Sequence, residues 1–485
     1  MGGNYEHGLY NQLMEVMERL DTVEKESKKE IRQLKDELSD LKKENQHLLE
    51  ENQLLRDDNA RMKSILNNNS SNTSQPPSTD KKSVKPANIY NGREKRGRRA
   101  GDQKGHKGTT FTKAQVEEKL RSGKYKHQIK NIGNSMAGSY VTRYEVDLDI
   151  TPVITEIHIY ADDKGHYAIP EEYRSEVVYG ANIKAMAVSL YSEGAMSNDR
   201  IAAFLNAVSN DGLELSEGSV FNFCKSMSEK SKLSIAHLEE ELLNEPVVAT
   251  DATVITVNGE QGYIRNFSVA KTVMYRAMKD KTLDMMHKVK FLEAFTGILV
   301  HDHETALYHF GTDHGECNVH IIRYLRKSTE ETGNEWSGEM IRLLSEMNRA
   351  RKSSIERGES AFTGPVLEEY EEKYAELIEK GRSENKKTVH RYAKKEEKKL
   401  LNRMEKYRHN HLLFLHDFRV PFDDNMSERD LRKAKNRQKM AGGFRKSSGH
   451  EMYCNILTII ETLKRRKMGM IRNIKLLFTG TPAIF

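Results

Sequence analysis

The chain has 485 residues, of which 31% are charged, and its formal net charge is only +6. This length leaves room for two to four domains, and the small charge excess makes the local clustering of cations more informative than their total. No apolar run approaches the ~20 residues of a membrane span, and the first residues lack the pattern of a secretory signal. Three widely spaced cysteines are expected to be reduced thiols, so the sequence indicates a cytoplasmic protein with no membrane partner.

Residues 1–66 carry a heptad pattern that predicts a coiled coil, and its best part runs from about residue 31 to residue 66. Three consecutive a positions are asparagines, namely Asn45, Asn52 and Asn59. Asparagine at an a position pairs best with its equivalent in a parallel partner, so these residues favour a parallel homodimer, or a higher oligomer, at some cost in stability. The alternative is a long solvated helix packed on its own protein. The predicted seam contains Leu34, Leu38, Leu41, Asn45, Leu48, Asn52, Leu55 and Asn59.

Residues 67–113 are predicted to be a disordered linker with a basic arm. The first part is rich in Asn, Ser and Pro and buries too little apolar surface to order itself. In "GREKRGRRAGDQKGHKG" (92–108), clustered cations alternate with glycine, which is typical of an arm that follows nucleic-acid phosphates. A solubilising linker is the alternative. The predicted DNA contacts are Arg93, Arg96, Arg98, Arg99, Lys104 and Lys107.

Two small domains are expected next. Residues 114–172 are predicted to be β-rich, because "RYEVDLDITPVITEIHIY" alternates in polarity as two short strands around Pro152 would. Residues 173–244 have a helical period with glycine-containing breaks. These breaks are compatible with a DNA-binding helix-turn-helix, and equally with an ordinary helical domain.

Residues 245–329 are predicted to begin a mixed α/β core of the ribonuclease-H-like kind, since three strand patterns precede a helix pattern and a fourth strand pattern. Asp251 lies inside the first, apolar strand, where an acid needs a metal or hydrogen-bond donors. Asp302 ends the fourth strand. If those strands are neighbours, the two carboxylates converge, and a two-metal phosphoryl-transfer site would need a third.

The stretch "PFDDNMSERDLRKAKNRQ", from Pro421, can supply that third carboxylate. A helix is predicted to begin near Met426, with Glu428 in its first turns, while Asp423 and Asp424 compete for the ligand role and one of them is better placed to cap the helix. The cations that follow are predicted to hold DNA phosphates beside the metals. They are Arg429, Arg432, Lys433 and Arg437.

Several motifs together resemble the ordered signatures of the insertion-sequence-sixty-six transposases, bacterial enzymes of the DDE class. They are "RRAGDQKGHKG", "VVATDAT", "CNVHIIRYL" and "PFDDNMSERDLRKAKNRQKMAGGFRKSSG". The resemblance implies cleavage of element ends and strand transfer into target DNA, with two Mg²⁺ (or Mn²⁺) ions held by Asp251, Asp302 and Glu428 as the catalytic acids. It also implies association with the bacterial nucleoid on DNA, and small accessory proteins encoded with the element.

The resemblance also implies that a helical insertion, here residues 330–415, divides the catalytic core, whose last part is residues 416–485. Such an insertion would present basic helices to DNA, although a solvated helical hairpin without direct function is the alternative. Two other functions remain open from the sequence. One is a non-catalytic DNA-binding coiled-coil protein derived from a transposase, and the other is a metal-dependent nuclease without strand transfer.

Four residues have no predicted role in catalysis. Related proteins often carry paired zinc-ligand cysteines after the basic arm, but this chain has none there, so no structural zinc is expected. Cys317 and His320 have the spacing of half a zinc site, yet no second pair stands nearby. His301 and His303 flank Asp302 and are expected to be bystanders, with DNA contact as the alternative.

Overall fold

The computed structural model describes the chain except residues 1–2, 74–111, 124–126, 130–141, 145 and 147–149. The fold is mixed α/β and mostly helical, with three antiparallel strands in one part of the chain and two parallel strands in another. The chain divides into two compact units. The first comprises Met1–Lys85 and Ile298–Asp424, and the second comprises Pro86–Gly297 and Asn425–Phe485.

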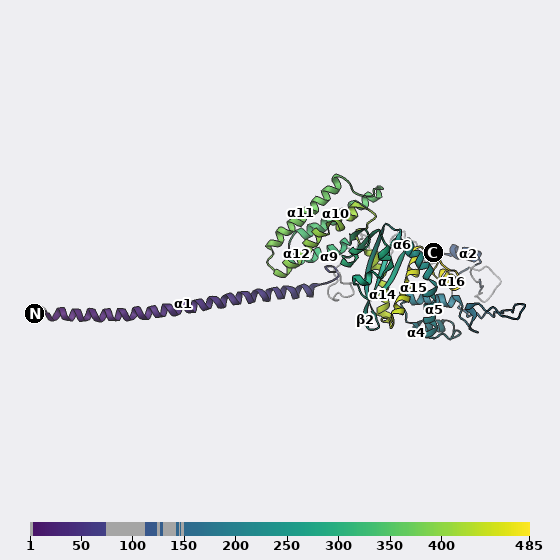
Figure 1. The fold of residues 1–485 in the computed structure, drawn as a ribbon, viewed down its shortest axis with the longest axis horizontal. Helices are drawn as coiled ribbons and strands as arrows, with labels where there is room; N and C mark the ends of the chain where they lie inside the picture. The colour runs from purple at the N-terminus through teal and green to yellow at the C-terminus, as the bar shows by residue number, and fades with distance from the viewer. Residues whose placement is uncertain (1–2, 74–111, 124–126, 130–141, 145, 147–149) are drawn as a thin grey trace. The chain divides into compact units, whose positions relative to one another are not determined.

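The first unit contains a long N-terminal helix, two short parallel strands and a set of helices (Figure 1). The predicted helical character of 330–415 is confirmed. The second strand was not predicted, because its four residues, "DHGE", show no apolar pattern. The elements are α1 (Gly3–Asn67), β4 (Ile298–His301), η3 (Thr305–His309), β5 (Asp313–Glu316), α9 (Asn318–Thr332), α10 (Trp336–Glu356), α11 (Pro365–Lys387), α12 (Arg391–Lys406) and α13 (Arg408–His416).

Helices α9 to α12 pack side by side (Figure 1). The Trp336 side chain is fully buried, and its indole Nε1 donates to Glu397 Oε1 at 2.7 Å. Gly381 of α11 faces this ring so closely that a Cβ would come within 2.7 Å of it. A residue without a side chain is therefore needed where α11 approaches α10.

The end of α1 is fixed to this helical set. Lys327 Nζ donates to Asn68 Oδ1 at 2.9 Å, and Asn72 Nδ2 donates to Glu330 Oε2 at 2.8 Å. Arg391 of α12 lies 3.9 Å from the carboxylate of Asp57. The helix therefore has an anchor at its C-terminal end within the first unit.

The second unit contains an antiparallel three-stranded part and the remaining helices. Three of its strands were predicted from β-branched alternation, and all three are confirmed. The single helix expected near residues 282–295 is instead two short ones. The elements are α2 (Lys113–Arg121), η2 (Glu171–Tyr173), α3 (Ala181–Glu193), α4 (Asn198–Val208), α5 (Glu217–Lys230), α6 (Lys232–Leu243), β1 (Val247–Val257), β2 (Glu260–Ser268), β3 (Val273–Met278), α7 (Leu283–Met286), α8 (Lys290–Ala294), α14 (Asn425–Ala441), α15 (Ser447–Arg465) and α16 (Met470–Phe478).

The strands expected around Pro152 are not formed among the described residues of 127–169, where backbone pairing is limited to the bridge between Ala161 and Tyr167. Ile154 is 98% exposed and Val153 is 85% exposed. The segment does alternate in polarity, but alternation produces a strand only where a partner strand can pair with it and its apolar side chains can pack on other residues.

One hydrophobic core joins the helical region 173–244 to the C-terminal helices. Val188 of α3, Ile264 of β2 and Ile459 of α15 are all fully buried in this cluster. The segment 173–244 and residues 425–485, which the sequence predicted to lie in separate domains, thus share a core. Helix α14 packs on β1 and β2, and α15 packs on β3.

Candidate functional site

Asp251 lies in the middle of β1 and is partly buried. Its cross-strand partner in the antiparallel ladder is Asn266 of β2. The Asn266 side chain turns back on this partner, since its Oδ1 accepts from the Asp251 backbone N–H at 3.0 Å. The position of Asp251 is therefore fixed by a side chain as well as by the strand.

Asn266 also reaches the beginning of α14. Its Nδ2 donates to the Ser427 carbonyl at 3.1 Å and lies 3.2 Å from Ser268 Oγ. The Asn266 side chain is fully buried, so each of these groups would lose a partner without access to water if it were removed. One carboxamide thus links the backbone of Asp251 to the residue that precedes Glu428, across 161 positions of the chain.

Glu428 is in the first turn of α14 and is partly exposed. An acid at this position is favourable in any helix, because it faces the positive end of the helix dipole. Its location beside the Asn266 link is what distinguishes it from an ordinary first-turn acid. The predicted start of this helix near Met426 is confirmed, and Asp424 immediately precedes it.

Two further contacts hold α14 in place. Asp430 Oδ2 accepts from Ser268 Oγ at 2.7 Å and pairs with Arg465 of α15 at 2.5 Å. At the other end of α14, Gly442 has a φ of +74°. A Cβ on the next residue, Gly443, would clash with the Thr256 carbonyl. The Phe444 backbone N–H then donates to Thr256 O at 2.8 Å. The Gly-Gly-Phe motif therefore fastens the chain after α14 to the end of β1.

The four cations predicted to hold DNA lie in two different environments. Arg429 and Arg432 are exposed. Lys433 instead forms ion pairs with Glu193 and Glu461. Arg437 is 7% exposed, and its guanidinium lies 3.8 Å from the centre of the Tyr191 ring and donates to the Met196 carbonyl at 2.9 Å.

The contacts of Lys433 and Arg437 join α14 to the helical region of the second unit. In this structure, a DNA phosphate would have to compete with these contacts for either side chain. The predicted arm contacts, Arg93 to Lys107, lie outside the described residues.

Asp302 follows β4 in the first unit and is partly buried. Its neighbours are both fixed in place. The His301 carbonyl accepts from the Cys317 N–H at 2.9 Å, and the His301 ring lies 3.2 Å from His314 Nδ1. His303 has a φ of 73°, in the left-handed region that a residue with a Cβ rarely occupies.

His303 is held by Glu316, the last residue of β5, whose carboxylate is completely buried. Oε1 accepts from His303 Nδ1 and from the Tyr308 hydroxyl, each at 2.5 Å. Oε2 accepts from Arg403 Nη2 at 2.7 Å and from His411 Nε2 at 3.0 Å. Burial alone would raise the pKa of Glu316, but the hydrogen bonds from His303 and His411 and the charge of Arg403 outweigh it and hold this pKa well below its usual range.

The segment before α14 is held by a buried arginine. Arg351 of α10 donates to the Val420 carbonyl at 2.9 Å, and the Asp424 N–H lies 3.3 Å from Cys317 Sγ. Asp424 is 1% exposed, whereas Asp423 is partly exposed. Cys317 thus contacts the backbone of the "PFDD" stretch, and His320 lies 3.1 Å from Arg323 Nη1.

The donor chemistry of the predicted acids fits Mg²⁺ or Mn²⁺, which prefer carboxylate oxygens. The Asn266 link supports this fit for Asp251 and Glu428, because it ties the strand that carries one acid to the helix turn that carries the other. Over the described part of the chain, no group of three or more His, Cys, Asp or Glu side chains is arranged to hold a metal ion. The three cysteines are buried, and none of them forms a disulfide among the described residues.

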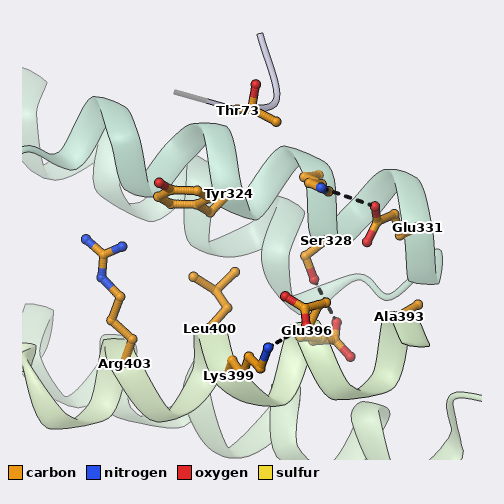
Figure 2. A pocket seen from close by; sticks show the side chains of 11 residues that line it. Thr73, Tyr324, Ser328, Glu331, Ala393, Glu396, Lys399, Leu400 and Arg403 are labelled. Atoms are coloured by element: carbon orange, nitrogen blue, oxygen red, sulfur yellow. Dashed lines mark hydrogen bonds and ion pairs between the residues drawn. The ribbon is translucent and has the colours of Figure 1, made fainter. Parts of the chain in front are cut away.

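A separate pocket of about 260 Å³ lies between α9 and α12, with Thr73 among its lining residues (Figure 2). Its charges are largely matched within the wall: Lys399 pairs with Glu396 at 2.7 Å, and Lys327 lies 3.7 Å from Glu331. Arg403 borders the pocket while its guanidinium reaches Glu316. This balanced lining does not select an anion.

Sequence reasoning missed Asn266, Asp430 and Glu316. A signal for Asn266 was present, because an asparagine stands inside the strand pattern "YIRNFSVA" and an amide that is buried in a strand needs partners. Asp430 belongs to the "SERD" motif but was passed over as one charge among many. Glu316 lies in a strand that the pattern did not reveal, so nothing marked it.

Comparison with known proteins places these residues in context. The family model described as "Transposase IS66 family" matches residues 176–452, more than half of the chain, and this range includes Asp251, Asp302 and Glu428. A second model, described as "Family of unknown function (DUF6444)", matches residues 15–112. No curated protein matches the chain. None of the described helices is long and apolar enough to cross a membrane.

Proposed function

Because the chain belongs to the IS66 family of transposases, we propose that it cleaves the ends of a DNA element and transfers them into target DNA with Asp251, Asp302 and Glu428 as its catalytic acids. The observation that carries the proposal is the Asn266 side chain, which ties the backbone of Asp251 to the first turn of α14. A structural role alone does not require an acid in β1 and an acid in that turn to share one buried anchor.

Two divalent ions bound by these acids would supply an activated oxygen nucleophile and stabilise the leaving oxygen of the phosphodiester. The chain's own contribution is to hold the acids. Asp251 is fixed on both sides, by the β ladder and by Asn266, and Glu428 is fixed because α14 is fastened at its start and just beyond its end. Asp302 enters the proposal from its place directly after β4 within the family match.

The exposed cations of α14 are proposed to hold DNA phosphates close to the acids. Arg429 and Arg432 lie on the exposed side of the helix, one and four residues after Glu428. Lys433 and Arg437, which make internal contacts, are proposed to keep α14 in position instead. The basic arm of residues 92–108 would add contacts that depend on salt but not on DNA sequence.

We also propose that α1 pairs in parallel with a second copy of the chain. The predicted seam is exposed: Leu34 is 58%, Leu41 62% and Leu55 62% accessible to solvent. The residues of α1 that are less exposed recur at Gln53, Asp57, Ala60 and Ser64, which occupy the b and f positions of the same heptad register. The face that packs on the protein is thus opposite to the seam, so both contacts can form at once.

Sedimentation of a segment covering residues 31–66 tests this pairing. A dimer at tens of micromolar is expected, and replacing Asn45, Asn52 and Asn59 with leucine should strengthen association but loosen its stoichiometry. A monomer throughout this range would show that the seam does not pair.

Cleavage and binding measured on one labelled duplex of the element's end test the catalytic assignment. Glu428→Gln and Asp251→Asn should each reduce cleavage on the order of a thousandfold, since loss of a metal-holding charge removes several kcal/mol of transition-state stabilisation. Binding to the same duplex should change little. Asp423→Asn is the matched control. A Glu428→Gln protein that cuts normally, with an inactive Asp423→Asn protein, would transfer the role to Asp423. Cleavage without joined products would indicate a nuclease.

A further inference from the structure

The Glu316 carboxylate gathers donors from distant parts of the first unit. Its side chain is 0% exposed, and its four hydrogen-bond partners are His303, Tyr308, Arg403 and His411. Arg403 and His411 belong to α12 and α13, 87 and 95 residues further along the chain. A buried carboxylate is costly unless its lone pairs are satisfied, and these four donors together satisfy them.

The other side of this cluster is the backbone next to Asp302. His303 shares a peptide bond with Asp302 and adopts a φ of 73°. A residue with a Cβ keeps such a conformation only where its surroundings impose it. Here the imposing contacts are the bond from His303 Nδ1 to Glu316 and the edge-on packing of the His303 ring against Tyr407, with ring centres 4.7 Å apart.

Asp302 is thus held from both directions. On one side, the His301 carbonyl is bonded to the Cys317 N–H, which follows Glu316 directly. On the other side, the His303 ring is bonded to Glu316 itself. Both hydrogen bonds lead to the C-terminal end of β5, where Glu316 is followed by Cys317. Arg403 and His411 of the helical insertion bond to Glu316 at the same place.

We propose that Glu316, anchored by Arg403 and His411 of the helical insertion, is a positioning residue that orients Asp302 by holding His303 in its left-handed conformation. This proposal rests on the proposed role of Asp302 as a catalytic acid. The helical insertion would then do more than present cations to DNA, because Arg403 of α12 and His411 of α13 would help to keep Asp302 in position.

The test is Mn²⁺ binding to the full-length protein by titration calorimetry, with metal-dependent cleavage as a second readout. Residues that support a metal ligand typically change metal affinity 10–100-fold when they are altered. Glu316→Gln should therefore weaken Mn²⁺ binding at least about tenfold. Glu316→Gln should also lower the rate of cleavage, and higher metal concentrations should partly restore this rate. The affinity of the variant for end DNA should stay within about twofold of that of the original protein.

Glu371→Gln is the matched control. Glu371 of α11 also accepts a hydrogen bond from a histidine of α13, His416, at 2.9 Å and lies 3.6 Å from Arg408. It makes the same kind of pair, but its partners among the described residues are on α13 and not on β4 or β5. Its replacement should leave the Mn²⁺ affinity unchanged.

His303→Gly provides a variant that does not bury an altered group. Glycine accepts the left-handed conformation without strain but cannot bond to Glu316, so it should also weaken Mn²⁺ binding several-fold. A folded Glu316→Gln or His303→Gly protein with the original Mn²⁺ affinity would overturn the positioning role. Asp302→Asn separates a failure of the positioning role from a failure of the catalytic assignment. If the Asp302→Asn protein binds Mn²⁺ with the original affinity, Asp302 is not a metal ligand, and the positioning role of Glu316 is then also wrong.

Discussion

The surroundings of Asp251 and Glu428 differ in kind from those of Asp302. In the second unit, a short path through Asn266 connects a strand to a neighbouring helix, and both belong to the core of that unit. In the first unit, the backbone around Asp302 depends on Glu316, whose Arg403 and His411 partners come from an insertion. One setting is built from the sheet and the helix that packs on it, and the other is completed by helices added to it.

This difference indicates how the acids respond to change. A side chain such as Asn266 transmits a perturbation directly, because its two bonds fix the relative positions of β1 and α14. Glu316 has four partners, so the loss of one leaves the others to hold the backbone. We therefore expect single substitutions to be more damaging around Asp251 and Glu428 than around Asp302.

Asn266→Leu should have the largest effect. It leaves the Asp251 N–H and the Ser427 carbonyl buried without their partner, which costs about 1–3 kcal/mol for each group and so roughly 2–6 kcal/mol in the free energy of unfolding. Cleavage should also fall sharply. Denaturant unfolding measures the first effect and the end-DNA assay the second. Asn473→Leu is a suitable control, because the Asn473 side chain bonds locally, to Gly469 O at 2.7 Å just before α16. Equal stability losses in the two variants would count against the special position of Asn266.

Acidification should affect the second unit before the first. Burial lowers the pKa of His450 to about 4, and its ring stacks on Phe444 beyond α14. Above pH 6.5 the ring is neutral in both folded and unfolded chains, so it makes no contribution. Between pH 6.5 and pH 4 the unfolded chain takes up the proton and the folded chain does not, which removes about 1.4 kcal/mol of stability per pH unit, or roughly 3 kcal/mol in all.

His450→Phe should abolish this loss, as measured by urea unfolding of the full chain from pH 7 to pH 4. The exposed His409 provides the control substitution. Glu316 in the first unit behaves differently, because it is a carboxylate whose pKa is lowered in the folded chain. Its contribution to stability is complete above its ordinary pKa near 4.5 and is lost only as the pH falls below that value. If His450→Phe has the same pH dependence as the unchanged protein, buried His450 is not the group that titrates.

Arg403→Gln should have an intermediate effect. It removes one charged donor from Glu316, which costs about 1.5–3 kcal/mol, while His303, Tyr308 and His411 still satisfy the carboxylate. Thermal or denaturant unfolding gives the stability change. A loss of stability larger than that of Asn266→Leu would reverse the expected order. It would show that the contacts from the insertion contribute more to stability than the link between β1 and α14.

Arg432→Ala should have the smallest effect on stability, within about 0.5 kcal/mol, because exposed side chains contribute little. Binding to end DNA should weaken, and the slope of log K against log salt should fall by about one phosphate contact. Arg437→Ala is the informative contrast: its guanidinium is buried against Tyr191, so stability should drop more than for Arg432→Ala. An unchanged salt slope for Arg432→Ala would remove this residue from the DNA contacts.

The amino-acid sequence by itself determined the elements whose signals are local. β1, β2 and β3 were predictable because β-branched and apolar residues recur along them and turn residues separate them. The start of α14 and the helices of the insertion followed from capping and helical period for the same reason. The strand patterns that contain Asp251 and Asp302 and the motif that contains Glu428 are also local, so the three acids could be predicted from them.

Only the tertiary structure decided which polar side chains meet. Asn266 bonds to Ser427 across 161 positions, and three of the four side chains that donate to Glu316 lie 13 to 95 positions away, separations at which no periodicity carries information. The structure likewise divided four similar cations of α14 into exposed and internally paired ones, and the described residues around Pro152 form no paired strands although the segment alternates in polarity. Burial and partner choice depend on how elements pack together, and this is why a pattern along one segment could not reveal them.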